Sequence, residues 1–219
     1  MAGKKQAGRG QGKPVIAIAG EGQHDRDVLR QLLPVLCRWP AARPPKIIEV
    51  KTPVRLKKAE NQLAPRLERL HLLAQGQATR LQAQLAGIVV HVDLDAVIDD
   101  AYENRRRQLS AELQKTFGCD TALALAADEM EAWLMLFPDA FPKVKSTWQL
   151  TQQDRRKNLG TIAGGSKEYL KNRLTRPPYL ESHAPKVIEE AVKHGYVAAC
   201  DSSRNRSYAD FTADLAQWR

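Results

Sequence analysis

Short runs of apolar residues alternate with helical patterns along the first part of the chain. Four of these runs are rich in valine, isoleucine or alanine and have the length of buried parallel strands; they span residues 15–19, 47–50, 88–92 and 121–126. Apolar residues recur at helical spacing in the segments that follow them, at residues 25–37, 61–85, 101–117 and 128–137. The alternation predicts an α/β fold, with a mostly parallel sheet and helices on both faces.

The alternation stops after Pro138. The remaining sequence is rich in proline, lysine and arginine, with helical patterns near residues 167–174, 186–194 and 209–218. We therefore expect a disordered basic arm at residues 1–13, an α/β domain at residues 14–137, and a C-terminal helical lobe at residues 138–219 that packs on the same domain.

Composition and charge narrow the class of protein. Hydrophobic residues make up 43% of the chain and charged residues 27%, as in a globular protein. Lysine and arginine exceed the acidic residues by nine, which favours polyanionic partners such as nucleic acid. The three cysteines form no Cys-x-x-Cys motif, and no apolar stretch approaches the ~20 residues of a membrane span. We expect a cytoplasmic protein with no secretory signal.

Carboxylates follow three of the four predicted strands at the points where the strands end. They are Glu21, Asp25, Asp93, Asp95, Asp128 and Glu131. Ligands of open α/β sheets bind at this edge, and the first and third strands are neighbours in a flavodoxin-like order. Because clustered like charges repel, such a group needs a cation or raised pKa values, and oxygen ligands suit Mg²⁺ or Mn²⁺. We therefore predict that these six residues are metal ligands.

Other interpretations apply to several of these residues. Asp25 also stands where a residue caps a helix, and His91, on the face of Asp93, is either a metal ligand or a packed core residue. The pair Gly20-x-Gly22 resembles the start of a dinucleotide fingerprint, but Asp25 occupies the position of the third glycine. This departure argues against a phosphate cradle, so the glycines are interpreted as a tight turn that presents Glu21.

Basic runs occur outside the acidic clusters, at residues 55–58, 105–107, 155–157 and 167–176. A charge run is usually a solvated face. Several such runs beside an acidic metal site favour a track for a phosphate backbone.

The acidic motifs resemble those of a known fold. Glu21 stands in a Glu-Gly-x-x-Asp context, and Asp93-x-Asp95 follows the third strand. This combination resembles the Toprim fold of topoisomerases, primases, small ribonucleases and OLD-type nucleases. The segments 129–133 (Glu-Met-Glu-Ala-Trp) and 204–211 (Arg-Asn-Arg-Ser-Tyr-x-x-Phe) look like a small stand-alone Toprim-like bacterial family, over about residues 14–218. Its members often accompany an ATPase in phage-defence loci, and the family commonly has Glu where this chain has Asp25.

The resemblance implies a Mg²⁺-dependent nuclease that acts on DNA or RNA, with an ATPase as a partner protein. It also implies a catalytic lysine, for which Lys167 and Lys186 are both candidates. The catalytic set predicted in this way is Glu21, Asp93, Asp95, Glu131 and Lys186. A rival hypothesis is a non-catalytic nucleic-acid-binding or complex-assembly subunit with a vestigial acidic pocket, and a third is a nucleotide-binding α/β module.

Overall fold

A parallel sheet stands at the centre of the protein. The computed structural model describes residues 12–37, 39, 44–53, 55–57, 59, 62–161 and 165–218. Within them, four strands form one sheet: β1 (Lys13–Ala19), β2 (Lys46–Val50), β3 (Ala83–Asp93) and β4 (Asp120–Ala126). Their order is β2-β1-β3-β4, and every neighbouring pair is parallel. The predicted α/β, Rossmann-like fold is confirmed, and β1 lies beside β3.

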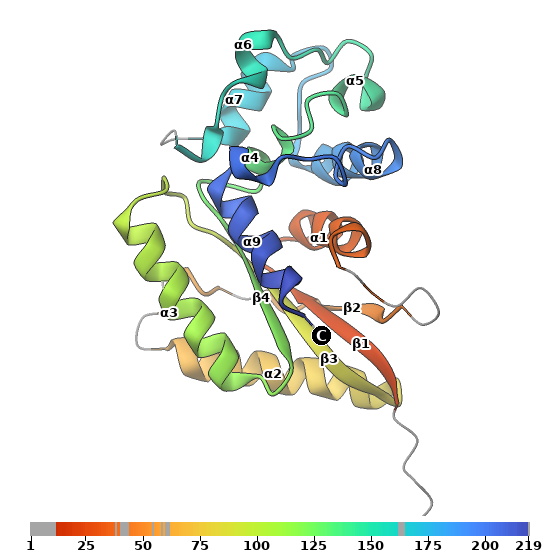
Figure 1. Ribbon diagram of the computed structural model, residues 1–219, viewed down its shortest axis with the longest axis vertical. Helices are drawn as coiled ribbons and strands as arrows, with labels where there is room; N and C mark the ends of the chain where they lie inside the picture. Colours follow the sequence, from red (N-terminus) through yellow and green to blue (C-terminus); the bar gives the residue numbers. More distant parts are fainter. Residues whose placement is uncertain are drawn as a thin grey trace, which may run out of the picture.

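Helices cover both faces of the sheet (Figure 1). They are α1 (Gln23–Leu36) and α9 (Arg206–Ala216) on one face, and α2 (Leu63–Arg80) and α3 (Asp100–Thr116) on the other. Side chains alternate between the faces along each strand. Ile16 and Ile18 of β1 join the core on the α1 side, whereas Ala17 joins the core on the α2 side. Both faces are therefore buried, which explains the nearly unbroken apolar strands.

Short helices gather beyond the carboxyl ends of the strands (Figure 1). They are α4 (Glu131–Leu134), α5 (Phe141–Val144), α6 (Gln152–Arg155), α7 (Ser166–Arg173) and α8 (Ala184–Lys193), with 3-10 turns at Leu159–Thr161, Glu181–His183 and Ser202–Arg204. Helix α8 packs against α1, and α9 runs along β4. The three helical patterns of the C-terminal sequence correspond to α7, α8 and α9.

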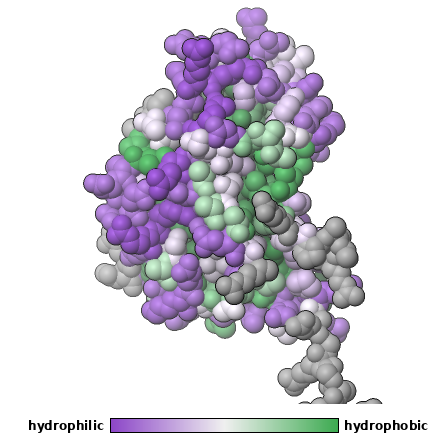
Figure 2. Space-filling model, in the orientation of Figure 1, coloured by the Kyte–Doolittle hydropathy of each residue, from purple (hydrophilic) through white to green (hydrophobic). Residues whose placement is uncertain are grey.

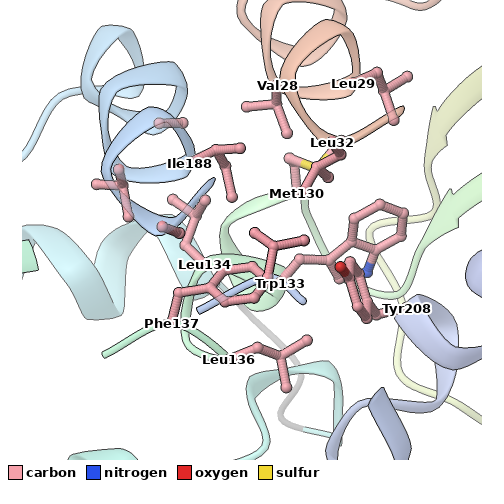
Figure 3. Packing of buried hydrophobic residues seen from close by; sticks show 14 of the residues in the cluster. Val28, Leu29, Leu32, Met130, Trp133, Leu134, Leu136, Phe137, Ile188 and Tyr208 are labelled. Carbon is pink, nitrogen blue, oxygen red and sulfur yellow. The ribbon is translucent and has the colours of Figure 1, made fainter. Parts of the chain in front are cut away.

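A core rich in large side chains joins these helices to the sheet. In Figure 3, Leu32 of α1 and Ile188 of α8 lie with Trp133 of α4 in one cluster. Trp133 is fully buried, stacks on Phe211 with a centroid distance of 5.4 Å, and donates from Nε1 to Ser207 Oγ at 2.8 Å. The one-turn helix α4 is thus held mainly by the burial of its tryptophan, since so short a helix is not stable alone.

Three predicted boundaries were wrong. The helix predicted at 61–85 ends at Arg80, because Gln82 turns the chain with φ 52° and β3 already begins at Ala83. The helix predicted at 128–137 is only the single turn of α4; Asp128 has φ 63°, so the helix cannot begin there, and it ends at Leu134. Lys13 belongs to β1 and not to the predicted arm, of which residues 1–11 lie outside the described residues.

Side chains close the outer edge of β4. The Leu123 N–H donates to Asp214 Oδ2 of α9 at 3.0 Å, and the Leu123 carbonyl oxygen accepts from Arg106 Nη1 of α3 at 3.3 Å. The carbonyl oxygen of Thr121 accepts from Trp218 Nε1 at 3.2 Å. These contacts occupy backbone groups that an edge strand otherwise offers to another chain.

Polar residues cover much of the face of the molecule seen in Figure 2. Figure 2 shows hydrophilic residues over α3 and over the end of the molecule formed by α6 and α7. In the part of the chain that the structure describes, no helix combines the length and the apolar character needed to cross a bilayer.

Candidate metal centre

The imidazole of His91 lies between two carboxylates at the carboxyl end of the sheet. His91 Nδ1 is 3.5 Å from Asp25 Oδ2, and His91 Nε2 is 3.2 Å from Asp93 Oδ1. The imidazole is fully buried, yet neither ring nitrogen makes an aligned hydrogen bond, so both contacts are ion pairs with poor hydrogen-bond geometry. Among the described residues, these three form the one group whose ligand atoms lie within 4.8 Å of one another.

Two glycines make room for this group. A Cβ atom on Gly20 would lie 3.3 Å from the Cβ of His91, and a Cβ on Gly22 would lie 2.8 Å from Asp25 Oδ2. The Gly22 N–H donates to the same Asp25 oxygen at 3.0 Å, so Asp25 also caps α1. The Gly20-x-Gly22 pair therefore lets β1 and the start of α1 approach His91 and Asp25 closely. Asp25 is both a cap and a member of the group.

Charge and burial shift the pKa values of the group. Burial disfavours the charged imidazole, but the carboxylates of Asp93 and Asp25 outweigh burial and raise the pKa of His91 to about 9. Burial acts to raise the pKa of Asp93, but His91 and the N–H of Met130, which donates to Asp93 Oδ1 at 3.0 Å, hold that pKa below its usual value. Burial and the charge of Asp93 raise the pKa of Glu21. Glu21 is thus close enough for the charge of Asp93 to act on its carboxyl, although Glu21 is not a member of the Asp25–His91–Asp93 group.

A second ionic cluster adjoins the first, where β4 passes into α4. Lys167 Nζ pairs with Glu129 Oε1 at 3.1 Å and with Glu181 Oε1 at 3.0 Å. Glu131 is 5% exposed and accepts from the hydroxyl of Tyr179 at 3.3 Å. Burial raises the pKa of Glu131 to about 7, against the opposing charge of Lys167. A buried carboxyl with this pKa can take up or release a proton near neutral pH.

Asp95 and Asp128, both predicted as ligands, lie outside the Asp25–His91–Asp93 group. The side chain of Asp95 is 62% exposed and forms an ion pair with Lys57. Asp128 is buried, and its Oδ2 accepts from the backbone N–H of Ser166 at 2.6 Å and from the Ser166 hydroxyl at 2.5 Å. Asp128 Oδ2 is therefore occupied by Ser166, the first residue of α7.

The two candidate lysines have different surroundings. Lys186 is exposed on α8, where its charge helps to lower the pKa of His183, after burial as the larger cause. Lys167 instead forms an ion pair with Glu129, and its positive charge acts to lower the pKa values of Glu131 and Asp93. The structure thus brings Lys167, and not the predicted Lys186, to the acidic edge.

The structure brings together part of the predicted centre. Asp25 and Asp93 meet at His91, and Glu21 and Glu131 are near enough for the charge of Asp93 to act on them. The sequence did not predict the contact of Tyr179 with Glu131, because the two residues are 48 positions apart in the chain. No local pattern marks such a contact. Glu129 and Lys167 could be found from the sequence, because they stand in the segments 129–133 and 167–176, which were already marked by their motif and their charge.

The fold and the site define a Rossmann-like α/β protein with a histidine–carboxylate group at its strand ends. No protein-family model, curated protein or solved structure matches the chain. The Toprim resemblance therefore stays a prediction from the sequence motifs.

The variant Glu131→Gln should stabilise the protein at pH 8 and not at pH 4. A carboxyl whose pKa is raised on folding binds its proton more tightly in the folded state, so stability is lost as pH rises from about 4.5 to about 7. The loss amounts to about 3 kcal/mol, which the uncharged amide avoids. Thermal melting of both proteins from pH 4 to pH 8 measures this difference. Glu129→Gln, which removes one of the two carboxylates paired with Lys167, should bring no gain in stability at pH 8, and an equal gain would contradict the assignment.

Proposed function

We propose that this protein is a divalent-metal-dependent nuclease that cleaves phosphodiester bonds of DNA or RNA. The observation that carries the proposal is the group of Asp25, His91 and Asp93, whose ligand atoms lie within 4.8 Å of one another at the carboxyl ends of β1 and β3. The net charge of +9 supports a polyanionic substrate. The Glu21 and Asp93 motifs that resemble Toprim nucleases lie at the same edge.

The residues fit a metal ion by the chemistry of their donors. The ring nitrogens of His91 are buried without an aligned hydrogen bond, and Asp25 and Asp93 offer carboxylate oxygens. Nitrogen and oxygen donors of this kind suit Mn²⁺, and the carboxylates suit Mg²⁺. Asp25, His91 and Asp93 would hold the ion. When bound, such an ion activates water and offsets charge on the phosphate oxygens.

The surrounding residues of the chain supply the remaining chemistry. Glu21, whose pKa is raised by burial and by Asp93, accepts a proton from the attacking water. Lys167 offsets negative charge in the transition state from the second cluster. Burial keeps Glu131 available as a proton donor near neutral pH, and the Tyr179 hydroxyl, which donates to Glu131 Oε1, holds the carboxyl group in place.

Metal-dependent cleavage tests the proposal. Supercoiled plasmid, single-stranded DNA and tRNA are each incubated with the protein and Mg²⁺, Mn²⁺ or EDTA, and cut ends are counted on denaturing gels. We expect cutting with Mg²⁺ or Mn²⁺ and none with EDTA. The same samples with the predicted ATPase partner absent and present would show whether activity depends on it. Absence of cutting with either ion in both arrangements would contradict a nuclease.

One observation favours a second candidate function. The His91 imidazolium already balances Asp25 and Asp93, and Lys57 and Lys167 pair with neighbouring carboxylates. An acidic pocket with built-in counter-charges is also what a non-catalytic nucleic-acid-binding or assembly subunit would retain. Tight nucleic-acid binding without cutting, and without uptake of Mn²⁺, would identify this second function.

A further inference from the structure

Three arginines line a pocket of about 210 Å³ in the region between β2 and α2. Arg55 comes from the connection between β2 and α2, and Arg66 and Arg69 come from the N-terminal half of α2. The last two are three residues apart, so they share one helix face. Leu70, which is buried, and Leu73, which is half-buried, supply apolar lining. The pocket therefore combines a concentrated positive charge with an apolar wall.

The positive charge of this pocket is not neutralised within the described residues. No carboxylate among them forms an ion pair with Arg55, Arg66 or Arg69. The guanidinium group of Arg66 is already hydrogen-bonded within the protein: it donates to the carbonyl oxygen of Arg55 and to Gln62 Oε1, the latter at 3.1 Å. Arg55 and Arg69 are exposed. Their guanidinium groups are thus the two that remain for a ligand, and together they suit an anion with several oxygens.

A short anchored segment joins the pocket to the acidic edge. Lys57 pairs with Asp95, directly beyond β3, and stands two residues after Arg55. Two residues of extended chain span at most about 7 Å, so the pocket and this ion pair are close neighbours. Leu56 between them is fully buried, and Arg105 of α3 donates to the carbonyl oxygen of Lys57 at 2.9 Å. These contacts hold Leu56 in the core and Lys57 against α3, next to Arg55 of the pocket.

We propose that Arg55 and Arg69 bind a backbone phosphate of the nucleic-acid strand, beside the candidate metal centre on its β2 side. The inference rests on the proposed function, because it places the scissile phosphodiester at the Asp25–His91–Asp93 group. Guanidinium forks match phosphate oxygens in shape and charge. The pocket holds the strand and takes no part in the chemistry.

The experiment compares two pairs of substitutions that remove equal charge. Arg55→Gln/Arg69→Gln removes the pocket charges, and Arg80→Gln/Lys143→Gln removes two exposed charges from the end of α2 and from α5. Arg69→Gln alone is a third variant that leaves the β2–α2 connection unchanged. Binding of a fluorescent 12-nucleotide single strand is titrated at several salt concentrations in EDTA, so no cleavage interferes. Melting temperatures establish that each variant is folded.

We expect the pocket pair to raise Kd roughly ten-fold at low salt, as the loss of one charge-assisted contact predicts. The slope of log K against log salt should become shallower by about 0.7, the value for one phosphate of a single strand. Arg69→Gln should produce part of this change, and the control pair should change Kd less than the pocket pair does. Equal losses in both pairs, or no loss in either, would overturn the pocket. If the pairs differ but the parent protein never cuts nucleic acid, the pocket stands and the nuclease function fails.

Discussion

Asp93→Asn should lower metal-dependent cleavage more than about 100-fold, because loss of a direct ligand exceeds the 10–100-fold effect of losing an outer partner. Asp95→Asn should keep activity within a few-fold of the parent. The two residues are only two apart, but Asp93 contacts His91 while Asp95 is exposed and pairs with Lys57. The amide of the Asp93 variant can still accept the hydrogen bond from Met130, so the turn into α4 is kept.

Binding of Mn²⁺ provides the measurement that does not depend on turnover. Titration calorimetry on the parent and on both variants should give a saturable site for the parent and for Asp95→Asn, and none for Asp93→Asn. Thermal melting in EDTA checks that Asp93→Asn is folded. If Asp95→Asn loses binding and activity as completely as Asp93→Asn does, the metal centre involves the exposed carboxylate and the Asp25–His91–Asp93 assignment is wrong.

Trp133→Ala should produce the largest loss of stability, about 3–5 kcal/mol, as for large-to-small changes of buried aromatic residues. For a protein of this size, the melting temperature should fall by roughly 10 °C. Trp133 is fully buried against Phe211 and Tyr208, and its loss also leaves the Ser207 hydroxyl without the indole donor. Denaturant titration of the parent and the variant measures the difference.

Trp218→Ala is the matched control for this change. Trp218 is only half-buried, and its Nε1 donates to the carbonyl oxygen of Thr121 at the sheet edge. Its truncation should cost less than half as much as that of Trp133. Since α4 carries Glu131 two residues before Trp133, the Trp133 variant should also lose cleavage activity while it is still folded. Equal stability losses at the two positions would show that α4 is not anchored through its tryptophan.

The sheet was predictable because its signals are local. The run at 15–19 is apolar on both faces, and the run at 88–92 is apolar except for His91, a pattern that is typical of buried parallel strands. The helix predicted at 61–85 ran too far for the same reason. The apolar spacing continues through Leu81 and Leu85, while the turn is made by the backbone of Gln82, whose side chain gives no warning.

The candidate site was predictable where it follows strand ends and not where it depends on side-chain direction. Asp93 follows β3, so its place at the sheet edge came from the chain alone. Whether Asp93 or Asp95 would point to His91 depends on the backbone after β3, where Asp95 adopts φ 50°. The alternation of an extended chain ends there, and the two carboxylates diverge. The choice of Lys167 over Lys186 required the fold of the C-terminal helices, which no periodicity in the sequence determines.

The closed edge of β4 has a consequence for synthesis of the chain. The groups that cover this edge come largely from α9 and Trp218, which follow β4 only after the whole C-terminal group of helices. Until these residues leave the ribosome, β4 presents an alanine- and leucine-rich strand with open backbone groups. During that period β4 can pair with a strand of another nascent chain, and the docking of α9 on β4 closes this route.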